Sequence, residues 1–334
     1  MILIGILCGL IAALGSSGSY LSTRNYVQKR TGNPNASTDM LLMSHVWMGL
    51  FGVLILPFSV GGNFVIPWSR VIGPQALNLV GYIAGQFALM FALKHAEASR
   101  VGPLLTSKLI VSSVLVMIFG QPIGHMARYL TGPQWVAVGL CVLAGLSINF
   151  TGGRMKSRAI LAVAVAAVGF SISDWGINLA LKAATPGDAF DLRAALFTAS
   201  FAYGSLGLIA LPFLLKAGRQ SAKNWRDAAP FGICWFVGVC GLFVAFGIVG
   251  ILLGTILQCT RGFLTILLAS ALMYRGHHHI EPHAPRPVIV RRLGAGVLMF
   301  VGIVMYRMAA PASVATTPPP ATVVPALAPA PADQ

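Results

Sequence analysis

Long apolar runs constrain the fold of this chain more than any other feature of its sequence. A helix needs about 17 to 25 mostly apolar residues to cross a hydrocarbon core roughly 30 Å thick. Ten runs of about this length can be marked, approximately at 1–21, 40–60, 77–93, 101–120, 135–150, 160–181, 194–215, 230–247, 251–274 and 293–305. Only 9% of the residues are charged, against about 25% in ordinary globular chains. We therefore predict an all-α integral membrane protein with ten transmembrane helices.

Some ends of these runs depend on weak signals. The fifth and tenth runs are short, and no charged residue separates the eighth run from the ninth. The break between those two runs therefore depends on Gly247, Gly250 and Gly254. Beyond the tenth run, residues 309–334 are rich in Ala, Pro, Thr and Val, a composition that predicts a disordered or polyproline-like tail.

Basic residues cluster between the apolar runs. A formal charge of +15 could indicate nucleic-acid binding, but short basic clusters between apolar segments are typical of loops that face anionic lipid. The odd-numbered loops carry 16 Lys and Arg residues, whereas the even-numbered loops and the C-terminus carry five. The positive-inside rule then places the odd-numbered loops in the cytoplasm and both termini outside. We expect a multi-pass protein of the cell (inner) membrane of a bacterium, with the lipid bilayer and no nucleic acid as its partner.

The two halves of the chain share a pattern of residues. At an offset of 154, the first run matches the sixth through Ala13, Gly15, Ser17 and Ser19 against Ala167, Gly169, Ser171 and Ser173. At 153, the third and fourth runs match the eighth and ninth through Tyr82, Gly85, Ala92 and Lys108 against Trp235, Gly238, Ala245 and Arg261. At 157, the fifth run matches the tenth through Gly139 and Gly145 against Gly296 and Gly302. Five helices is an odd number, so consecutive copies enter the membrane in opposite orientations. We predict two inverted five-helix repeats, at 1–152 and 153–308, with a shared cavity near the midplane.

Four segments carry a resemblance to a known family. In the first half they are GLIAALGSSGSYLSTRNYVQKR and KHAEASRVGPLLTSKLIVSSVLVMIFGQPIG, and in the second AVAAVGFSISDWGINLALKAATP and FGIVGILLGTILQCTRGFLTILLASAL. Over about residues 1–308 the chain resembles the drug/metabolite transporter superfamily, and within it the proteins with two EamA-type repeats. The resemblance implies a secondary transporter of a small metabolite. It also implies that basic residues on the fourth and ninth helices meet the anionic part of the substrate.

Three charged residues lie within predicted spans: Lys108, Asp174 and Arg261. Each costs roughly 2.5 to 3.5 kcal/mol to insert, so such residues face the bundle interior and are functional candidates. Arg261 lies about ten residues from either end of its run, roughly 15 Å deep. An ammonium and a guanidinium that face one cavity favour a carboxylate or phosphate. The alternative is that one of the two cations pairs with Asp174 or caps helix carbonyls.

Asp174 has a second interpretation. A carboxylate removed from water could take up and release a proton during transport, and related small multidrug transporters use a first-helix carboxylate for coupling. Tyr20 occupies the matching position in the first half. Asp174 is therefore a candidate for proton coupling, with protons as the coupling ion, and a structural ion pair is the alternative.

Uncharged polar and aromatic residues could complete a solute pocket. The candidates are Tyr20, Tyr82, Gln86, Trp175, Asn178, Trp235 and Gln258. Helix packing is the alternative for each of them, and the repeat-matched pair Tyr82 and Trp235 is the strongest. The segment from His277 to His283 contains four histidines, but their spacing is not that of a closed metal site, so we expect no metal.

Three function classes fit a chain of this kind. The first, which we predict, is a secondary transporter that moves a small metabolite by alternating access, an anionic one such as an amino acid, a carboxylate or a sugar phosphate. The second is a membrane-embedded enzyme, but no HExxH, GxSxG, paired acidic or Walker motif is present, so we predict neither an enzyme nor a cofactor. The third is a scaffold or receptor that binds partners through the histidine segment and the tail.

Overall fold

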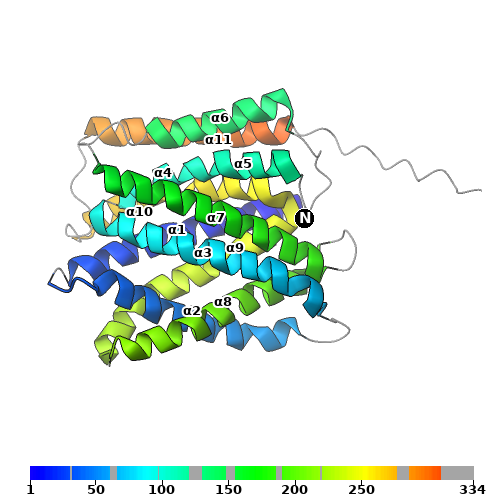
Figure 1. Cartoon of the computed structure of the whole chain (residues 1–334). Helices are drawn as coiled ribbons and strands as arrows, with labels where there is room; N and C mark the ends of the chain where they lie inside the picture. The colour runs from blue at the N-terminus through cyan, green and yellow to red at the C-terminus, as the bar shows by residue number, and fades with distance from the viewer. Residues whose placement is uncertain are drawn as a thin grey trace, which may run out of the picture.

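The regular elements of the described part of the chain are α-helices and a single turn of 3₁₀ helix. The computed structural model describes residues 1–30, 32–60, 66–96, 98–119, 130–147, 155–185, 190–218, 220–276 and 286–309. Its elements are α1 (Ile2–Gln28), α2 (Ala36–Ser59), α3 (Trp68–His95), α4 (Ala98–Leu104), η1 (Leu105–Ser107), α5 (Lys108–Phe119), α6 (Gly132–Ser147), α7 (Ser157–Ala184), α8 (Leu192–Lys216), α9 (Ala222–Cys259), α10 (Arg261–Tyr274) and α11 (Arg286–Met308). They run roughly side by side, with α6 and α11 at one edge and α2 and α8 at the other (Figure 1).

The outer surface of the bundle is apolar. Phe58, Leu208 and Leu215 are 81%, 71% and 73% exposed, and many other large apolar side chains face outward with them. A soluble monomer rarely exposes an apolar surface of that extent. Within the described residues, seven helical stretches are long and apolar enough to cross a membrane, and two further apolar helices are shorter. These properties are those of a multi-pass, all-α membrane protein.

Each predicted run overlaps a helix, but four places differ from simple uninterrupted spans. The ninth run is interrupted at Thr260, between α9 and α10. The fourth run is divided by the 3₁₀ turn Leu105–Ser107. Between the eighth and ninth runs the backbone turns at Gly250, where φ is 78° and ψ is 170°, a conformation almost confined to glycine. The predicted break is therefore confirmed at Gly250. The last helix begins at Arg286 and not near 293. The charged residues before 293 end the apolar run, but they do not end the helix.

Close packing pairs helices from the two halves of the chain. The most extensive contacts join α1 with α9, α3 with α7, α2 with α8 and α6 with α11. Glycines allow the backbones to approach at the crossings. A Cβ on Gly169 of α7 would lie 2.6 Å from the backbone nitrogen of Gly85 on α3, and one on Gly207 of α8 would lie 2.7 Å from Cα of Gly49 on α2. Membrane helices pack closely where such small residues meet.

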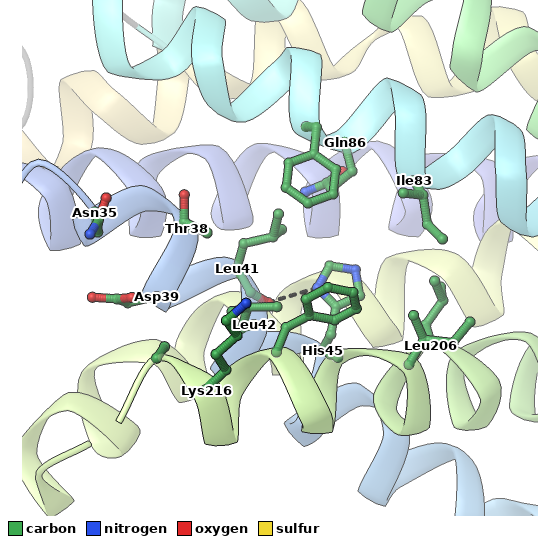
Figure 2. Close-up of a pocket in the computed structure, with 15 residues that line it drawn as sticks. Asn35, Thr38, Asp39, Leu41, Leu42, His45, Ile83, Gln86, Leu206 and Lys216 are labelled. Carbon is green, nitrogen blue, oxygen red and sulfur yellow. Dashed lines mark hydrogen bonds between the residues drawn. The ribbon is translucent and has the colours of Figure 1, made fainter. Parts of the chain in front are cut away.

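A cavity of about 570 Å³, which we call the vestibule, lies between α2, α3 and α8 (Figure 2). Asn35 and Lys216 lie at its mouth, at the ends of α2 and α8 that adjoin odd-numbered loops. His45 and Gln86 line its inner part, each nine residues from the corresponding helix end, or roughly 14 Å at 1.5 Å per residue. The vestibule therefore extends from one surface of the bundle toward its middle.

Candidate functional site

The two buried cations follow locally tightened turns of helix. Lys108 is the first residue of α5, directly after the 3₁₀ turn, and Arg261 is the first residue of α10, directly after Thr260. The Thr260 backbone N–H donates to the carbonyl of Leu257, three residues back, at 3.1 Å. Such turns within a helix release carbonyl groups for other partners and often mark functional positions.

Serine hydroxyls from the opposite half of the chain bind the backbone at both cations. The Ser17 hydroxyl of α1 is shared between the carbonyl oxygens of Ala13 at 2.8 Å and Arg261 at 2.9 Å. The Ser171 hydroxyl of α7 is shared in the same way between the carbonyl oxygens of Ala167 at 2.9 Å and Lys108 at 3.1 Å. Since both serines are fully buried, each bond fixes a cation-bearing helix against the first helix of the other half.

Lys108 forms a buried ion pair with Asp174. The Lys108 ammonium donates to Asp174 Oδ2 at 2.6 Å, and the two side chains are 1% and 5% exposed. Lys108 also donates to Gln258 Oε1, and the Thr255 hydroxyl donates to the same Asp174 oxygen at 3.4 Å. Of the two cations considered from the sequence, the one that pairs with Asp174 is therefore Lys108. The pair neutralises both charges at the junction of α5, α7 and α9.

Arg261 has no such partner. Its side chain is buried, with 2% of the residue exposed, and no carboxylate among the described residues forms an ion pair with it. One guanidinium nitrogen donates to the carbonyl of Leu105 over a long 3.4 Å, and Nε has no hydrogen-bond partner. The guanidinium carbon lies 6.0 Å from the centre of the Tyr20 ring, within reach of a cation–π attraction. The described side chains at the centre therefore sum to one positive charge.

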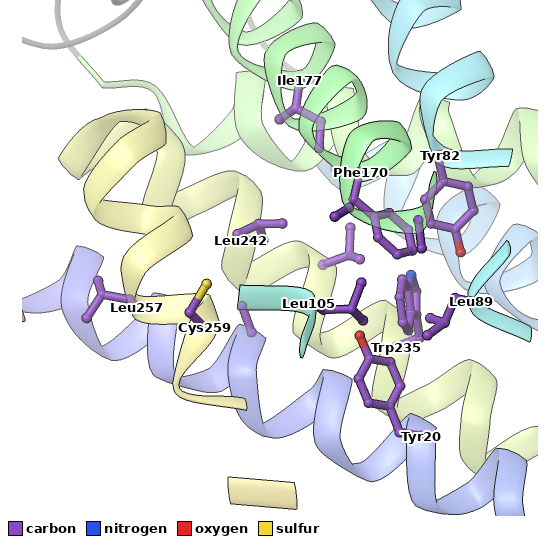
Figure 3. Packing of buried hydrophobic residues seen from close by; sticks show 14 of the residues in the cluster. Tyr20, Tyr82, Leu89, Leu105, Phe170, Ile177, Trp235, Leu242, Leu257 and Cys259 are labelled. Carbon is purple, nitrogen blue, oxygen red and sulfur yellow. The ribbon is translucent and has the colours of Figure 1, made fainter. Parts of the chain in front are cut away.

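Aromatic residues close the space beside the charges. Tyr82, Phe170 and Trp235 gather there, with the Tyr20 ring nearby (Figure 3). Trp235 Nε1 donates to the Tyr203 hydroxyl at 3.1 Å. The central cavity, which Tyr82, Phe170 and Trp235 line together with the charged residues, measures about 30 Å³, enough for one or two water molecules. A solute therefore has no room at the centre in this conformation.

The structure brings most of the predicted site residues together. Lys108, Arg261, Tyr82, Trp235, Gln258 and Asp174 all line the central cavity. Tyr20 lies next to it, with its ring centre 6.3 Å from that of Trp235.

Three predicted residues lie elsewhere. Gln86 lines the vestibule, and neither of its amide atoms has a hydrogen-bond partner. Trp175 packs on Phe119 with ring centres 5.7 Å apart. The Asn178 amide donates to the carbonyl of Asp174 within its own helix at 3.0 Å. The segment from His277 to His283 lies outside the described residues, and the described residues hold no cluster suited to a metal.

Two residues that shape the site were not among the candidates predicted from the sequence. One is His45, whose Nε2 lies 3.2 Å from the Tyr82 hydroxyl. The other is Tyr203, whose hydroxyl accepts a hydrogen bond from Trp235 Nε1. A signal existed: His45 and Tyr203 are separated by 158 positions, the same offset as Gly49 and Gly207. A search of the second run against the seventh at this offset would have marked both residues.

Comparisons with known proteins support the fold and no more. No protein-family model matches the sequence, and no curated protein matches it. Among solved structures 27 chains match. One, described as "Crystal structure of protein", has a TM-score of 0.58 at 15% sequence identity, and the match covers 90% of this chain and 98% of the other. At this identity the likeness shows a shared fold. Together with the apolar surface, it defines the chain as a multi-pass, all-α membrane protein.

Proposed function

We propose that the chain is a secondary transporter that moves a small anionic metabolite by alternating access. In this proposal it is a drug/metabolite transporter of the EamA type, with ten transmembrane helices in two inverted repeats at 1–152 and 153–308, in the cell membrane of a bacterium. The observation that carries the proposal is Arg261, a buried guanidinium without a carboxylate partner among the described residues, at the place where the two halves meet.

The hydrogen bonds between the halves support the inverted repeat. Ser17 bonds the carbonyl of Arg261, and Ser171 bonds the carbonyl of Lys108. Ser17 and Ser171 are separated by 154 positions, and Lys108 and Arg261 by 153. Exchange of the two halves therefore converts one bond into the other, as a two-fold axis requires.

The pairing of helices follows the same exchange. Under an offset near 154, the pair formed by α1 and α9 corresponds to the pair formed by α7 and α3. The pair formed by α2 and α8 corresponds to itself, and its glycines Gly49 and Gly207 face each other. The pair formed by α6 and α11 also corresponds to itself at an offset of 157. Helices that exchange with their own partner cross on the two-fold axis, so the axis passes through both crossings.

Charge favours an anion as the solute. A buried cation without a counter-charge is costly, and an anionic solute would supply that charge when it binds. A guanidinium suits carboxylates and phosphates because its N–H groups match two oxygens at once. Lys108 is neutralised by Asp174 in this conformation, so Arg261 is the primary anion ligand in the proposal. Protonation of Asp174 would release Lys108 as a second cation, and this is the proton coupling that we propose.

Counterflow in proteoliposomes tests the function. Purified protein is reconstituted with an unlabelled carboxylate, amino acid or sugar phosphate inside, and entry of the labelled compound is followed. Alternating access predicts that one of these compounds accumulates transiently, because internal solute returns the carrier to the outward state. Protein-free liposomes are the control. Absence of counterflow for every anion tested would overturn the proposal.

A further inference from the structure

We propose that the vestibule binds the apolar body of an amphipathic monocarboxylate. The substrate is then an amphipathic monocarboxylate and not a sugar phosphate. This inference rests on the proposed transport function and narrows its substrate. It starts from a difference in size. The vestibule measures about 570 Å³ and the central cavity about 30 Å³. Small-molecule sites occupy about 300 to 1,000 Å³, so the vestibule is the one of these two cavities that can hold a metabolite.

The walls of the vestibule select for apolar surface. Between the mouth and the inner end they consist of aliphatic and aromatic side chains, such as Leu42, Ile83 and Leu206 (Figure 2). Each hydroxyl of a sugar left without a partner there would cost about 1 to 3 kcal/mol. An apolar body would gain about 25 cal/mol for each Å² removed from water. A polyhydroxylated solute is therefore disfavoured and a hydrocarbon body is favoured.

Polar groups occur at the two ends, where they can guide a carboxylate. At the mouth, Lys216 and Asp39 both line the cavity (Figure 2). The Asp39 carboxylate accepts a hydrogen bond from Asn33 at 3.2 Å. At the inner end, Gln86 is 1% exposed and its amide N–H groups have no acceptor. A carboxylate would meet Lys216 first and the Gln86 amide next.

A single layer of side chains separates the vestibule from the centre. His45 lines the vestibule, and Tyr82 lines the central cavity. The two residues are in contact, with Nε2 of His45 3.2 Å from the Tyr82 hydroxyl. Displacement of this contact would join the vestibule to the cavity that Arg261 lines. The vestibule is therefore placed as an entry site on the odd-loop side of the bundle.

Binding to the full chain in lipid nanodiscs tests the inference, since detergent could occupy an apolar cavity. The probes are radiolabelled 3-phenylpropionate and glycerol 3-phosphate. Ala210 lines the vestibule and is 6% exposed, so Ala210→Phe should place a ring in it and weaken 3-phenylpropionate binding at least about tenfold, or 1.4 kcal/mol. Leu208→Phe is the matched control, because Leu208 lies on the same helix and is 71% exposed. It should bind as the wild type does.

A second variant covers the case in which Ala210→Phe fails to fold. Leu42→Gln makes one wall polar without adding bulk, and it should weaken 3-phenylpropionate binding and leave glycerol 3-phosphate binding unchanged or stronger. Equal binding of the two probes by the wild type would overturn the inference, as would wild-type affinity for 3-phenylpropionate in both folded variants. Counterflow of glycerol 3-phosphate alone would sink the vestibule inference and leave the transporter standing. Binding that depends on the vestibule, without counterflow of any anion, would overturn the transport proposal and leave the vestibule as a binding site.

Discussion

The ion pair between Lys108 and Asp174 makes the sharpest stability prediction. The two charges are 2.6 Å apart and at most 5% exposed, so solvent screens them little. Asp174→Asn leaves the Lys108 ammonium charged and buried, and removal of one partner of such a pair costs about 3 to 5 kcal/mol. Arg261→Gln should cost far less or stabilise the fold, because it removes a charge that no described carboxylate balances. Chemical unfolding of the purified variants in mixed micelles measures both differences.

The double variant Lys108→Met with Asp174→Leu provides the control. It replaces both charges by apolar groups of similar size, a change that is often neutral or stabilising in buried pairs. We expect its stability to return to within about 1 kcal/mol of the wild type, since the double substitution leaves neither member of the pair as a lone buried charge. Wild-type stability in Asp174→Asn would refute the reasoning, and so would a larger loss in Arg261→Gln than in Asp174→Asn.

Three further predictions concern packing, backbone and topology. Gly169→Ala should destabilise the bundle, because its Cβ would lie 2.6 Å from the backbone of Gly85, whereas Gly139→Ala meets nothing within 4 Å and should be neutral in the same unfolding assay. Gly250→Ala should cost about 1 to 3 kcal/mol, because φ at this position is 78°, and equal stability would contradict that strain. A cysteine at Lys223 in a cysteine-free background should react with an impermeant maleimide only in opened cells; reaction in intact cells would reverse the proposed topology.

The sequence predicted the helices well because their cause is local. Apolar runs form helices wherever lipid leaves backbone groups no other partner, and the break at Gly250 followed from a glycine in a run without charge. The start of α11 at Arg286 was missed because hydropathy reports where the chain enters lipid, not where the helix begins. The matched positions of Lys108 and Arg261 in the two halves were also visible in the sequence. In the structure both residues line the central cavity.

Partner choice within the site could not be predicted in the same way. Either cation could have paired with Asp174, and the structure gives it to Lys108 because α5 and α7 pack together there. The role of His45 depends on its distance to Tyr82 on another helix. The repeat offset shared with Tyr203 marks the position of His45, but it does not predict the contact with Tyr82. The vestibule likewise depends on how far α3 stands from α2 and α8, which no local pattern encodes.

Transport of anions by Arg261 variants tests whether this guanidinium binds the solute. Counterflow of the labelled anion that the wild type transports fastest is compared among the wild type, Arg261→Gln and the control Arg30→Gln. In the wild type the Arg30 guanidinium lies near the surface and pairs with Asp227 at 2.7 Å. The control should transport as the wild type does. Arg261→Gln should remain folded in the membrane and lose counterflow. Wild-type counterflow in a well-folded Arg261→Gln protein would contradict the account.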